Sequence, residues 1–503
     1  MALHFADIPA QLLMWQRVRE YAVPPSMIET ATARRAVGDW AGACAAARID
    51  IDFDLRAVRH RYGTEFVTRL RADLRRLAPD LLRWHMPRIP PHGRLRPGLT
   101  VSLSRYGSSG NSPVQLVVRT PPAWADGGQR MSLALWDERG GNQHGNEHRG
   151  GHRGGHGGSA PAHHPHPHPD RRFRLDLHRH LWDSSRCGEL ASRSGANIAP
   201  VLAPAGRPDP LAWLDDPVQP HPSDLNDHHS WASARWAAEA ELLLDAEGDS
   251  RGVFTVRLSA RDRRAFELVA PDVHHVPTFR PLREALPPQA YAELPLLPEA
   301  AARTLPDLAL LRAGLITTDR LHPLVTEALP VAEAWPVAEA RPVAEALPVA
   351  EAESAPGPVP QPGDPHVVEC RGEVHRIALR DGVLTAVDHD PAQLRREELL
   401  VALGGPGLPC LRAIDAVHRS PEALPAVQER LGHGDVSGAL AVVEGLLGPA
   451  AVLRDGPLRE TLESSAARRL DHGLFRSGLR PFSRPATLPV QGSRARPRPA
   501  RVR

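Results

Sequence analysis

The chain is 503 residues long, more than one hydrophobic core normally serves, and its 42% hydrophobic and 24% charged residues are ordinary for a globular protein. Its 52 prolines and 40 glycines predict long irregular segments. All 61 residues counted as lysine or arginine are arginine. The lack of lysine excludes P-loop nucleotide hydrolysis, protein-kinase chemistry and Schiff-base or pyridoxal-phosphate catalysis. The net charge of +2 gives the whole molecule no strong attraction to nucleic acid or acidic membranes.

The first predicted unit is a helical region over residues 1–98, with its helices between 8 and 86. Five apolar residues recur there at spacings of three or four, as one face of a helix requires: Phe66, Leu70, Leu74, Leu77 and Leu81. Residues 55–96 also hold eleven arginines against three acidic residues. Because guanidinium groups bind phosphate, this excess indicates a nucleic-acid surface as one alternative, and the solvated face of a helix as the other.

The second unit, residues 99–324, is predicted to be a β-rich, mostly antiparallel α+β domain. Alternating apolar residues predict strands at 101–103, 114–118, 131–135 and 173–177. A helix over 230–246 is expected to bury one face, formed by Trp231, Ala234, Ala238 and Leu242. A hairpin over 254–268 is expected to follow it. A Pro-rich stretch at 199–228 is expected to be a long loop.

The insertion at 139–170 is rich in His, Gly and Pro and is expected to be disordered, at the tip of an expanded hairpin. It contains eight histidines, His144, His148, His152, His156, His163, His164, His166 and His168. Neutral imidazole binds Ni, Zn and Cu, so the insertion is predicted to bind a divalent transition metal weakly. The alternative is a tolerated insertion with no selected role.

A second metal candidate is the more local set of Asp176, His178 and His180. On a strand, residues two apart point to the same side, so these three side chains would converge, with Asp183 or Cys187 completing the site. Cys187 could also form a nucleophilic thiolate pair with either histidine. The plainer alternative is the solvated face of a half-buried sheet.

The third predicted unit is a small hairpin-plus-helices domain over 366–480. A disordered linker at 325–365 precedes it, with four tandem P-V-A-E-A-x repeats whose prolines prevent a continuous helix. Asp381-Gly382 is the dipeptide of a tight hairpin turn, and Asp390-Pro391 is a typical helix start, as is Ser420-Pro421. An Arg/Pro-rich tail, 481–503, is expected to be disordered.

One eight-residue pattern occurs twice, at 38–45 and at 434–441, as Gly-Asp-x-x-Gly-Ala-x-Ala. In each copy a glycine would end one helix and an aspartate would cap the next. The pattern therefore predicts two helix–turn–helix hairpins at opposite ends of the chain. Two distant copies are too few for a repeat solenoid.

The remaining motifs exclude several site classes. The four cysteines, Cys44, Cys187, Cys370 and Cys410, form no C-x-x-C pair, and we expect them to behave as small buried hydrophobes. Gly434–Gly438 lacks the first glycine of a nucleophile elbow, and no H-E-x-x-H or dinucleotide-binding glycine pattern occurs. The start of the chain does not resemble a signal peptide, and no apolar run approaches the ~18 residues of a membrane helix, so a cytoplasmic protein without membrane contact is expected.

The sequence as a whole predicts an α+β multidomain protein with a helical N-terminal region, a β-rich middle domain and a small α-rich C-terminal domain. The leading functional hypothesis is a non-catalytic adaptor or regulatory protein that binds a protein partner through two tethered bodies. Metal binding through the His-rich insertion, nucleic-acid binding through 55–96 and the tail, and an enzyme without a recognisable motif are the alternatives. No catalytic residue is predicted, and no cofactor beyond the weakly bound metal.

Overall fold

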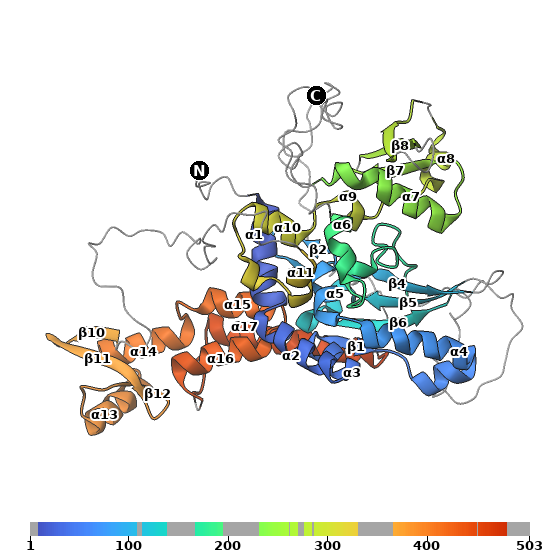
Figure 1. Ribbon diagram of the computed structural model, residues 1–503. Coiled ribbons are helices and arrows are strands. Elements are labelled where there is room, and N and C mark those ends of the chain that lie inside the picture. The colour runs from blue at the N-terminus through green and yellow to red at the C-terminus, as the bar shows by residue number, and fades with distance from the viewer. Residues whose placement is uncertain are drawn as a thin grey trace, which may run out of the picture.

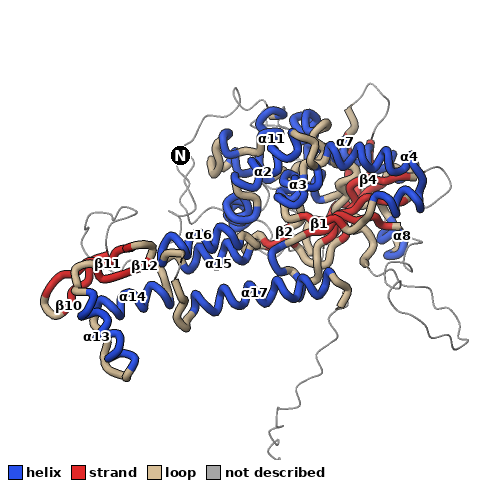
Figure 2. The backbone as a smooth tube through the Cα atoms, turned by 90° about the horizontal axis from the view of Figure 1, so that it is seen from below, coloured by secondary structure: helices blue, strands red, loops and turns tan. Residues whose placement is uncertain are grey.

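A computed structural model describes residues 9–107, 113–137, 166–194, 231–260, 262–269, 276–283, 286–329, 366–449 and 451–479. The protein has an α+β fold with several small sheets (Figure 1). The sheet β10–β12 and helix α13 lie at one end of the molecule, and helix α4 lies at the other (Figure 2). None of the described helices is long and apolar enough to cross a membrane.

The N-terminal region is helical, as predicted, with one short strand inside it. The described elements are α1 Ala10–Arg17, a π-helical turn Val18–Ala22, α2 Pro25–Ala36, α3 Trp40–Ala46, β1 Ile49–Ile51, α4 Leu55–Arg76 and α5 Pro79–His85. Asp54 caps α4 by accepting a hydrogen bond from the backbone N–H of Ala57. All five residues of the predicted apolar face are buried, and they continue past the end of α4 at Arg76 into α5.

The central sheet has the strand order β1-β6-β5-β4. The strands β4 Thr100–Tyr106, β5 Val114–Arg119 and β6 Met131–Trp136 are antiparallel neighbours, which confirms three of the predicted strands. Strand β1 was not predicted; it pairs with β6 in parallel. A small hairpin, β2 Arg88–Ile89 and β3 Arg94–Leu95, stands apart from this sheet.

The prediction of a fourth strand at 173–177 is wrong. The segment forms turns with a single bridge, between Arg174 and Ser102, and short helices follow at Arg179–Leu181, Cys187–Glu189 and α6 Leu190–Ser194. Phe173, Arg174 and Leu175 are all buried, so the alternation in the sequence does not separate a core face from a solvated face. The buried guanidinium of Arg174 is stabilised by Asp176 and Glu247.

A second sheet forms a smaller core of its own. Strands β7 Val253–Arg257, β8 Arg263–Val269 and β9 Thr278–Pro281 are antiparallel, and the predicted hairpin is confirmed. Helix α7, Trp236–Glu247, packs on this sheet through Trp236, Ala240 and Leu243. The face predicted for this helix is therefore wrong, and Leu242 is 44% exposed. The helix begins only at Trp236, after a 3-10 turn at Ser233–Arg235.

One large core joins residues from both sides of the predicted boundary at 98/99. Phe66, Leu70 and Leu74 of α4 pack with apolar residues of β4–β6. After the second sheet, α8 Pro288–Glu293 and α9 Glu299–Ala302 lead to α10 Pro306–Arg312, a 3-10 turn Thr318–Arg320 and α11 Pro323–Ala328. Leu308 of α10 and Val325 of α11 belong to the same core as α4. The N-terminal helices and the central sheet thus share their hydrophobic interior.

The C-terminal domain consists of a three-stranded sheet followed by five helices. They are β10 His366–Cys370, β11 Glu373–Arg380, β12 Val383–Ala386, α13 Pro391–Ala402, α14 Pro409–Arg419, α15 Leu424–Gly432, α16 Val436–Leu447 and α17 Pro457–Arg476. The Asp381-Gly382 turn is confirmed, with φ of 55° and 78°, and Asp390 caps α13 as predicted. The helix start predicted at Ser420-Pro421 is wrong, because Ser420 ends α14 and α15 begins at Leu424.

The repeated pattern forms the same helix–turn–helix twice, as predicted. Gly38 and Gly434 adopt φ of 76° and 82°, where glycine is favoured. Asp39 and Asp435 then accept a hydrogen bond from the backbone N–H three residues later. Each aspartate also pairs with the arginine five residues before it, Arg34 and Arg430 respectively.

The C-terminal helices dock on the N-terminal body. Arg48 donates to the carbonyl oxygen of His433 at 2.8 Å and pairs with Asp435 at 3.4 Å. Arg476, at the end of α17, pairs with Asp50 and Asp52 around β1. Figure 2 shows α15, α16 and α17 running from the small sheet β10–β12 to the body. Two segments about 400 residues apart in the chain therefore form one interface.

Candidate metal centre

Two cysteines and a histidine of the C-terminal domain place their side chains together. Cys370 ends β10, His389 lies between β12 and α13, and Cys410 lies in the first turn of α14. One ligand atom of each lies within 4.8 Å of the others. Tetrahedral zinc, with bonds of about 2.0–2.3 Å, needs ligand atoms about 3.3–3.8 Å apart. The three side chains therefore need only a small contraction to hold such an ion.

The local sequence explains this arrangement. A tight turn between β10 and β11 consists of Arg371 and Gly372, with φ of 58° and 83°. This turn places Cys370 directly opposite Glu373 in the sheet. His375 lies two residues beyond Glu373, so it shares a face of the sheet with Cys370. The same face packs on α14 through a small apolar cluster that includes both cysteines.

Two imidazole nitrogens at this place lack partners. Nε2 of His389 and Nδ1 of His375 are buried and accept or donate no hydrogen bond among the described residues. The two rings stack, with centroids 4.1 Å apart and planes inclined by 12°. Buried polar atoms are normally satisfied, so two unsatisfied ring nitrogens beside two thiols indicate a site for a ligand. His375 lies beside the three convergent side chains, and it would have to turn out of its stack on His389 to become a fourth ligand.

The cysteine side chains are free thiols in this structure. Burial raises the pKa of Cys410 to about 11, and its neighbour Cys370 adds to this effect. A divalent cation would replace the thiol protons and neutralise the buried thiolates. Two sulfur ligands and one imidazole match the preference of zinc, which accepts soft sulfur and nitrogen donors in tetrahedral geometry.

No known family model, curated protein or solved structure matches this chain.

The structure does not bring Asp176, His178 and His180 together as ligands. The carboxylate of Asp176 pairs with Arg174 and Arg105. Nδ1 of His178 lies 2.8 Å from the carbonyl oxygen of Arg174, and its Nε2 lies 3.1 Å from Glu239. Both histidines are 1% exposed, so they are not on a solvated sheet face either.

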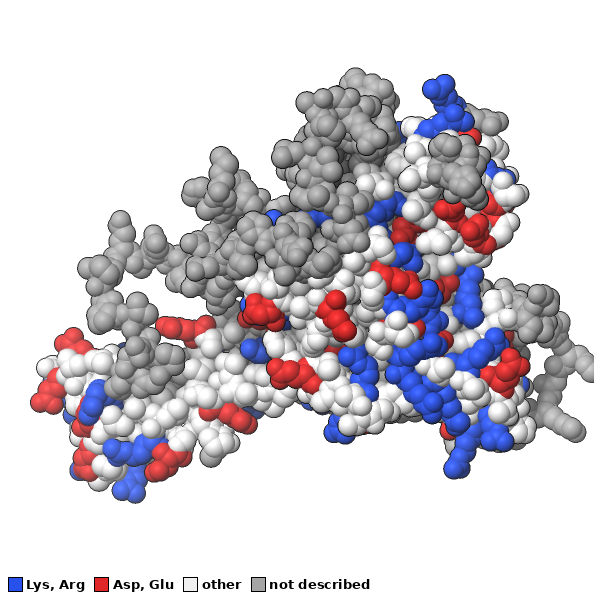
Figure 3. All heavy atoms as spheres, in the orientation of Figure 1, with Lys and Arg blue, Asp and Glu red and all other residues white. Residues whose placement is uncertain are grey.

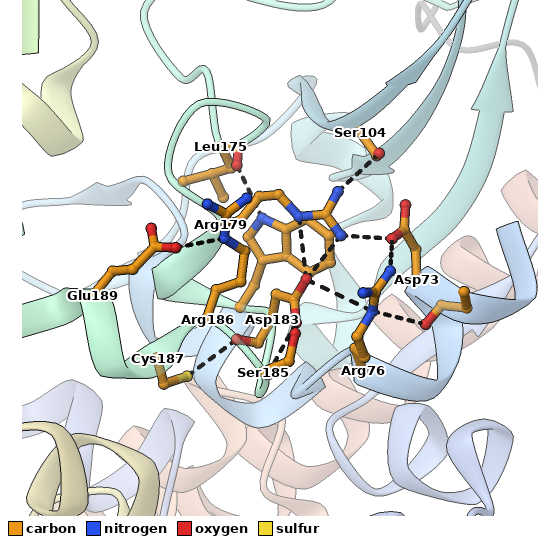
Figure 4. Close-up of polar contacts among 12 residues, drawn as sticks. Asp73, Arg76, Ser104, Leu175, Arg179, Asp183, Ser185, Arg186, Cys187 and Glu189 are labelled. Atoms are coloured by element: carbon orange, nitrogen blue, oxygen red, sulfur yellow. Dashed lines mark hydrogen bonds and ion pairs between the residues drawn. The ribbon is translucent and has the colours of Figure 1, made fainter. Parts of the chain in front are cut away.

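The residues that were expected to complete that site have other partners. Figure 4 shows Arg179 between Asp73 and Asp183, with Cys187 turned toward the backbone of Asp183. Asp183 also accepts hydrogen bonds from the backbone and the side chain of Ser185. The Cys187 thiol donates to the carbonyl oxygen of Asp183, and burial raises its pKa to about 12. This buried network holds the 173–189 segment against α4, and its cysteine is a poor nucleophile.

Only two histidines of the His-rich insertion fall within the described residues. They are His166 and His168, and the His168 ring lies 5.1 Å from the Trp136 ring. The other six, His144, His148, His152, His156, His163 and His164, lie outside the described residues, so weak metal binding by this segment stays a prediction.

The arginines of residues 55–96 divide into two groups. Arg83 and Arg88 are buried and donate to backbone carbonyl oxygens. Five arginines of α4 are exposed and form no ion pair within the described part of the chain, namely Arg56, Arg59, Arg69, Arg71 and Arg75. Figure 3 shows basic side chains gathered on the part of the molecule that contains α4.

The sequence contained one signal for the metal centre that spacing rules missed. Cys370 and Cys410 are forty residues apart, which no common zinc motif matches. Cys370 and His375, however, flank Arg371-Gly372, and recognition of a two-residue turn there would have placed both side chains on one face. His389 and Cys410 could be joined to them only by the packing of α14 on the sheet.

Proposed function

We propose that this protein is a non-catalytic adaptor whose C-terminal domain is stabilised by a zinc-type divalent cation. Cys370, His389 and Cys410 hold the ion, and His375 becomes the fourth ligand by turning out of its stack on His389. The convergence of Cys370, His389 and Cys410 within 4.8 Å carries the proposal. The ion links the end of β10, the loop after β12 and the start of α14, which otherwise share only a small apolar cluster.

The surroundings of the site support a structural role for the ion. A catalytic zinc keeps one position open to water and substrate, whereas a structural zinc is enclosed by four protein ligands. Cys370 and Cys410 are 1% and 0% exposed, and the His375 ring covers the His389 ring.

A protein partner is supported by the apolar surface of the same domain. Val367, Val374 and Val383 lie on the face of the sheet opposite Cys370, and are 56%, 68% and 50% exposed. Leu399 and Leu403 near the end of α13 are 65% and 86% exposed. Exposed apolar groups of this kind are typical of contact surfaces. The proposal includes a cytoplasmic location, where thiols stay reduced and available to a metal.

The test is cobalt substitution in the full chain. Thiolate coordination of Co²⁺ gives a sulfur-to-metal charge-transfer band, which the imidazoles of the His-rich insertion do not produce. We expect this band at one Co²⁺ per chain and its displacement by zinc. Cys370→Ser and Cys410→Ser should abolish it, whereas the matched buried-cysteine variants Cys44→Ser and Cys187→Ser should keep it. A Cys370–Cys410 disulfide, or a band that survives both serine variants, would refute the centre.

The adaptor role needs a separate measurement. A purified partner that binds the metal-loaded chain should bind at least about tenfold more weakly to Val367→Asp or Val374→Asp, since each change places a charge on the apolar face. Val276→Asp, at a residue 84% exposed outside this domain, is the control. Undiminished binding by both sheet variants would remove the support for this face.

A second candidate function, nucleic-acid binding, is favoured by the five exposed α4 arginines that form no ion pair with another described residue. We propose it as an alternative use of that helix, since arginine binds phosphate through paired N–H groups. Binding of a labelled oligonucleotide should weaken as salt rises, and Arg71→Ala with Arg75→Ala should weaken it at any sequence. Salt-independent or unchanged binding would reject this candidate.

A further inference from the structure

A second feature lies where the C-terminal helices meet the N-terminal body. A cleft of about 530 Å³ opens there, between the start of β1, the loop before β6, the start of α16 and the end of α17. Arg48, Asp50 and Arg130 line it from the N-terminal body. Arg469, His472 and Arg476 line it from α17. Each half of the molecule therefore contributes basic side chains.

The arginines of this cleft outnumber their carboxylate partners by one. Arg48 pairs with Asp435, Arg130 with Asp50, and Arg476 with Asp50 and Asp52. Arg469 is exposed and makes no ion pair with a described residue. The buried guanidinium of Arg83 donates to backbone carbonyl oxygens, among them those of Ala47 and Gln129 next to the lining residues, and has no carboxylate partner among the described residues. The charges of Arg48 and Arg130 add to the burial that lowers the pKa of Arg83, so this region carries excess positive charge.

Two neutral features also suit an anion. His472 is 8% exposed, lines the cleft and makes no hydrogen bond to any described residue. The first turn of α16, a helix of 12 residues, presents Val436 and Ser437 to the same space. Asp435 caps this helix by accepting from the N–H of Gly438, so an anion here would use the N–H groups of the first two helical residues and the partial positive charge of the N-terminus.

We infer that this cleft binds the phosphate groups of a small phosphorylated molecule. Arginine matches phosphate with two parallel N–H groups, and Arg469 has no carboxylate partner among the described residues. The volume lies within the range of small-molecule sites and suits a ligand of mononucleotide size. Since the walls come from both halves, a bound ligand bridges them and holds α17 against the body. This inference does not depend on the metal centre.

The test is calorimetric titration of the full chain with pyrophosphate, with inorganic phosphate and adenosine monophosphate as further arms. We expect saturable binding and a rise of the melting temperature. Arg469→Ala should weaken binding at least about tenfold without changing the fold, because Arg469 has no partner to lose among the described residues. Arg75→Ala, which removes an α4 arginine that also lacks an ion pair with any described residue, is the matched control and should bind as the parent does.

A second variant tests whether binding depends on the positive charge of the cleft itself. Ser437 is exposed and donates a long hydrogen bond of 3.4 Å to Asp435, so Ser437→Glu gives up that bond and places a negative charge in the cleft. It should abolish binding, and its melting temperature in the absence of ligand measures the effect of the lost bond. Tighter binding of adenosine monophosphate than of pyrophosphate would identify a nucleotide as the source of the phosphate. Equal binding by the parent and both cleft variants, or no binding by the parent, would overturn the inference.

Discussion

The two copies of the Gly-Asp turn allow one substitution to be compared in two surroundings. Gly38 and Gly434 have nearly the same φ, 76° and 82°, so an alanine at either position carries the same backbone strain, about 1–2 kcal/mol. A Cβ atom at Gly38 meets nothing within 4 Å. Gly38→Ala should therefore lower the free energy of unfolding by that strain alone.

Gly434→Ala should cost more because this turn packs against backbone. Its Cβ would lie 2.1 Å from the carbonyl oxygen of Gly128 and 2.4 Å from the carbonyl carbon, so either this turn or the segment around Gly128 has to move. Movement of the turn breaks the bonds of Arg48 to the His433 carbonyl and to Asp435. Hydrogen bonds of charged groups contribute about 1.5–3 kcal/mol each, so the added cost is about 3–6 kcal/mol.

The assay is amide hydrogen exchange, which measures local opening and suits a protein with several folded parts. Gly434→Ala should speed exchange in α17 and in the 123–129 segment on which that helix packs. Gly38→Ala should speed exchange only around α2 and α3. The reasoning is refuted if α17 keeps its protection in Gly434→Ala, or if the two variants lose equal stability.

Three further predictions concern stability. Burial lowers the pKa of His85 from 6.5 to about 4, so between these pH values the unfolded chain binds a proton that the folded protein does not. Denaturant melts should show stability falling by about 3 kcal/mol as the pH drops from 6.5 to 4, and His85→Gln should reduce this fall; an unchanged pH profile contradicts the argument. Leu243→Ala should lower the free energy of unfolding by about 2–5 kcal/mol, and Leu242→Ala, at the neighbouring residue, by less than about 0.5 kcal/mol. The reverse order would support the face of α7 that the sequence predicts. Asp39→Ala should cost about 1 kcal/mol through loss of the α3 cap, and equal stability in chemical denaturation would show that the cap contributes nothing.

Local signals predicted much of the fold. The Asp381-Gly382 turn, the Asp390 cap and both Gly-Asp turns each depend on a few neighbouring residues, and all are present in the structure. Strand β1 could not be predicted in the same way, because its three residues are defined by pairing with β6 about eighty residues later. The segment at 173–177 had the alternation of a strand, but burial of Arg174 beside Asp176 and Glu247 decided its conformation.

The candidate metal centre also has one part that neighbouring residues predict and one part that depends on distant contacts. The pair Cys370 and His375 follows from a short turn and could be read from the sequence. His389 and Cys410 join them only through the packing of β12 and α14, and the spacing of residues in the sequence does not predict that packing. His178 was a candidate because of its residue type, yet its contact with Glu239, sixty-one residues away, makes it part of a buried network.

The central sheet has two edges, and each is poorly suited to recruit a foreign strand. At one edge, β1 is only three residues long, and Asp50 and Asp52 carry charges that Arg130, Arg119 and Arg476 hold in place. At the other, β4 has an irregularity between Ser102 and Ser104, and Asp170 and Arg174 occupy part of its outer side. Short, charged, bulged or covered edges oppose strand-to-strand aggregation. The 170–174 segment therefore blocks part of this edge, and a chain lacking it would offer β4 as a template for intermolecular pairing.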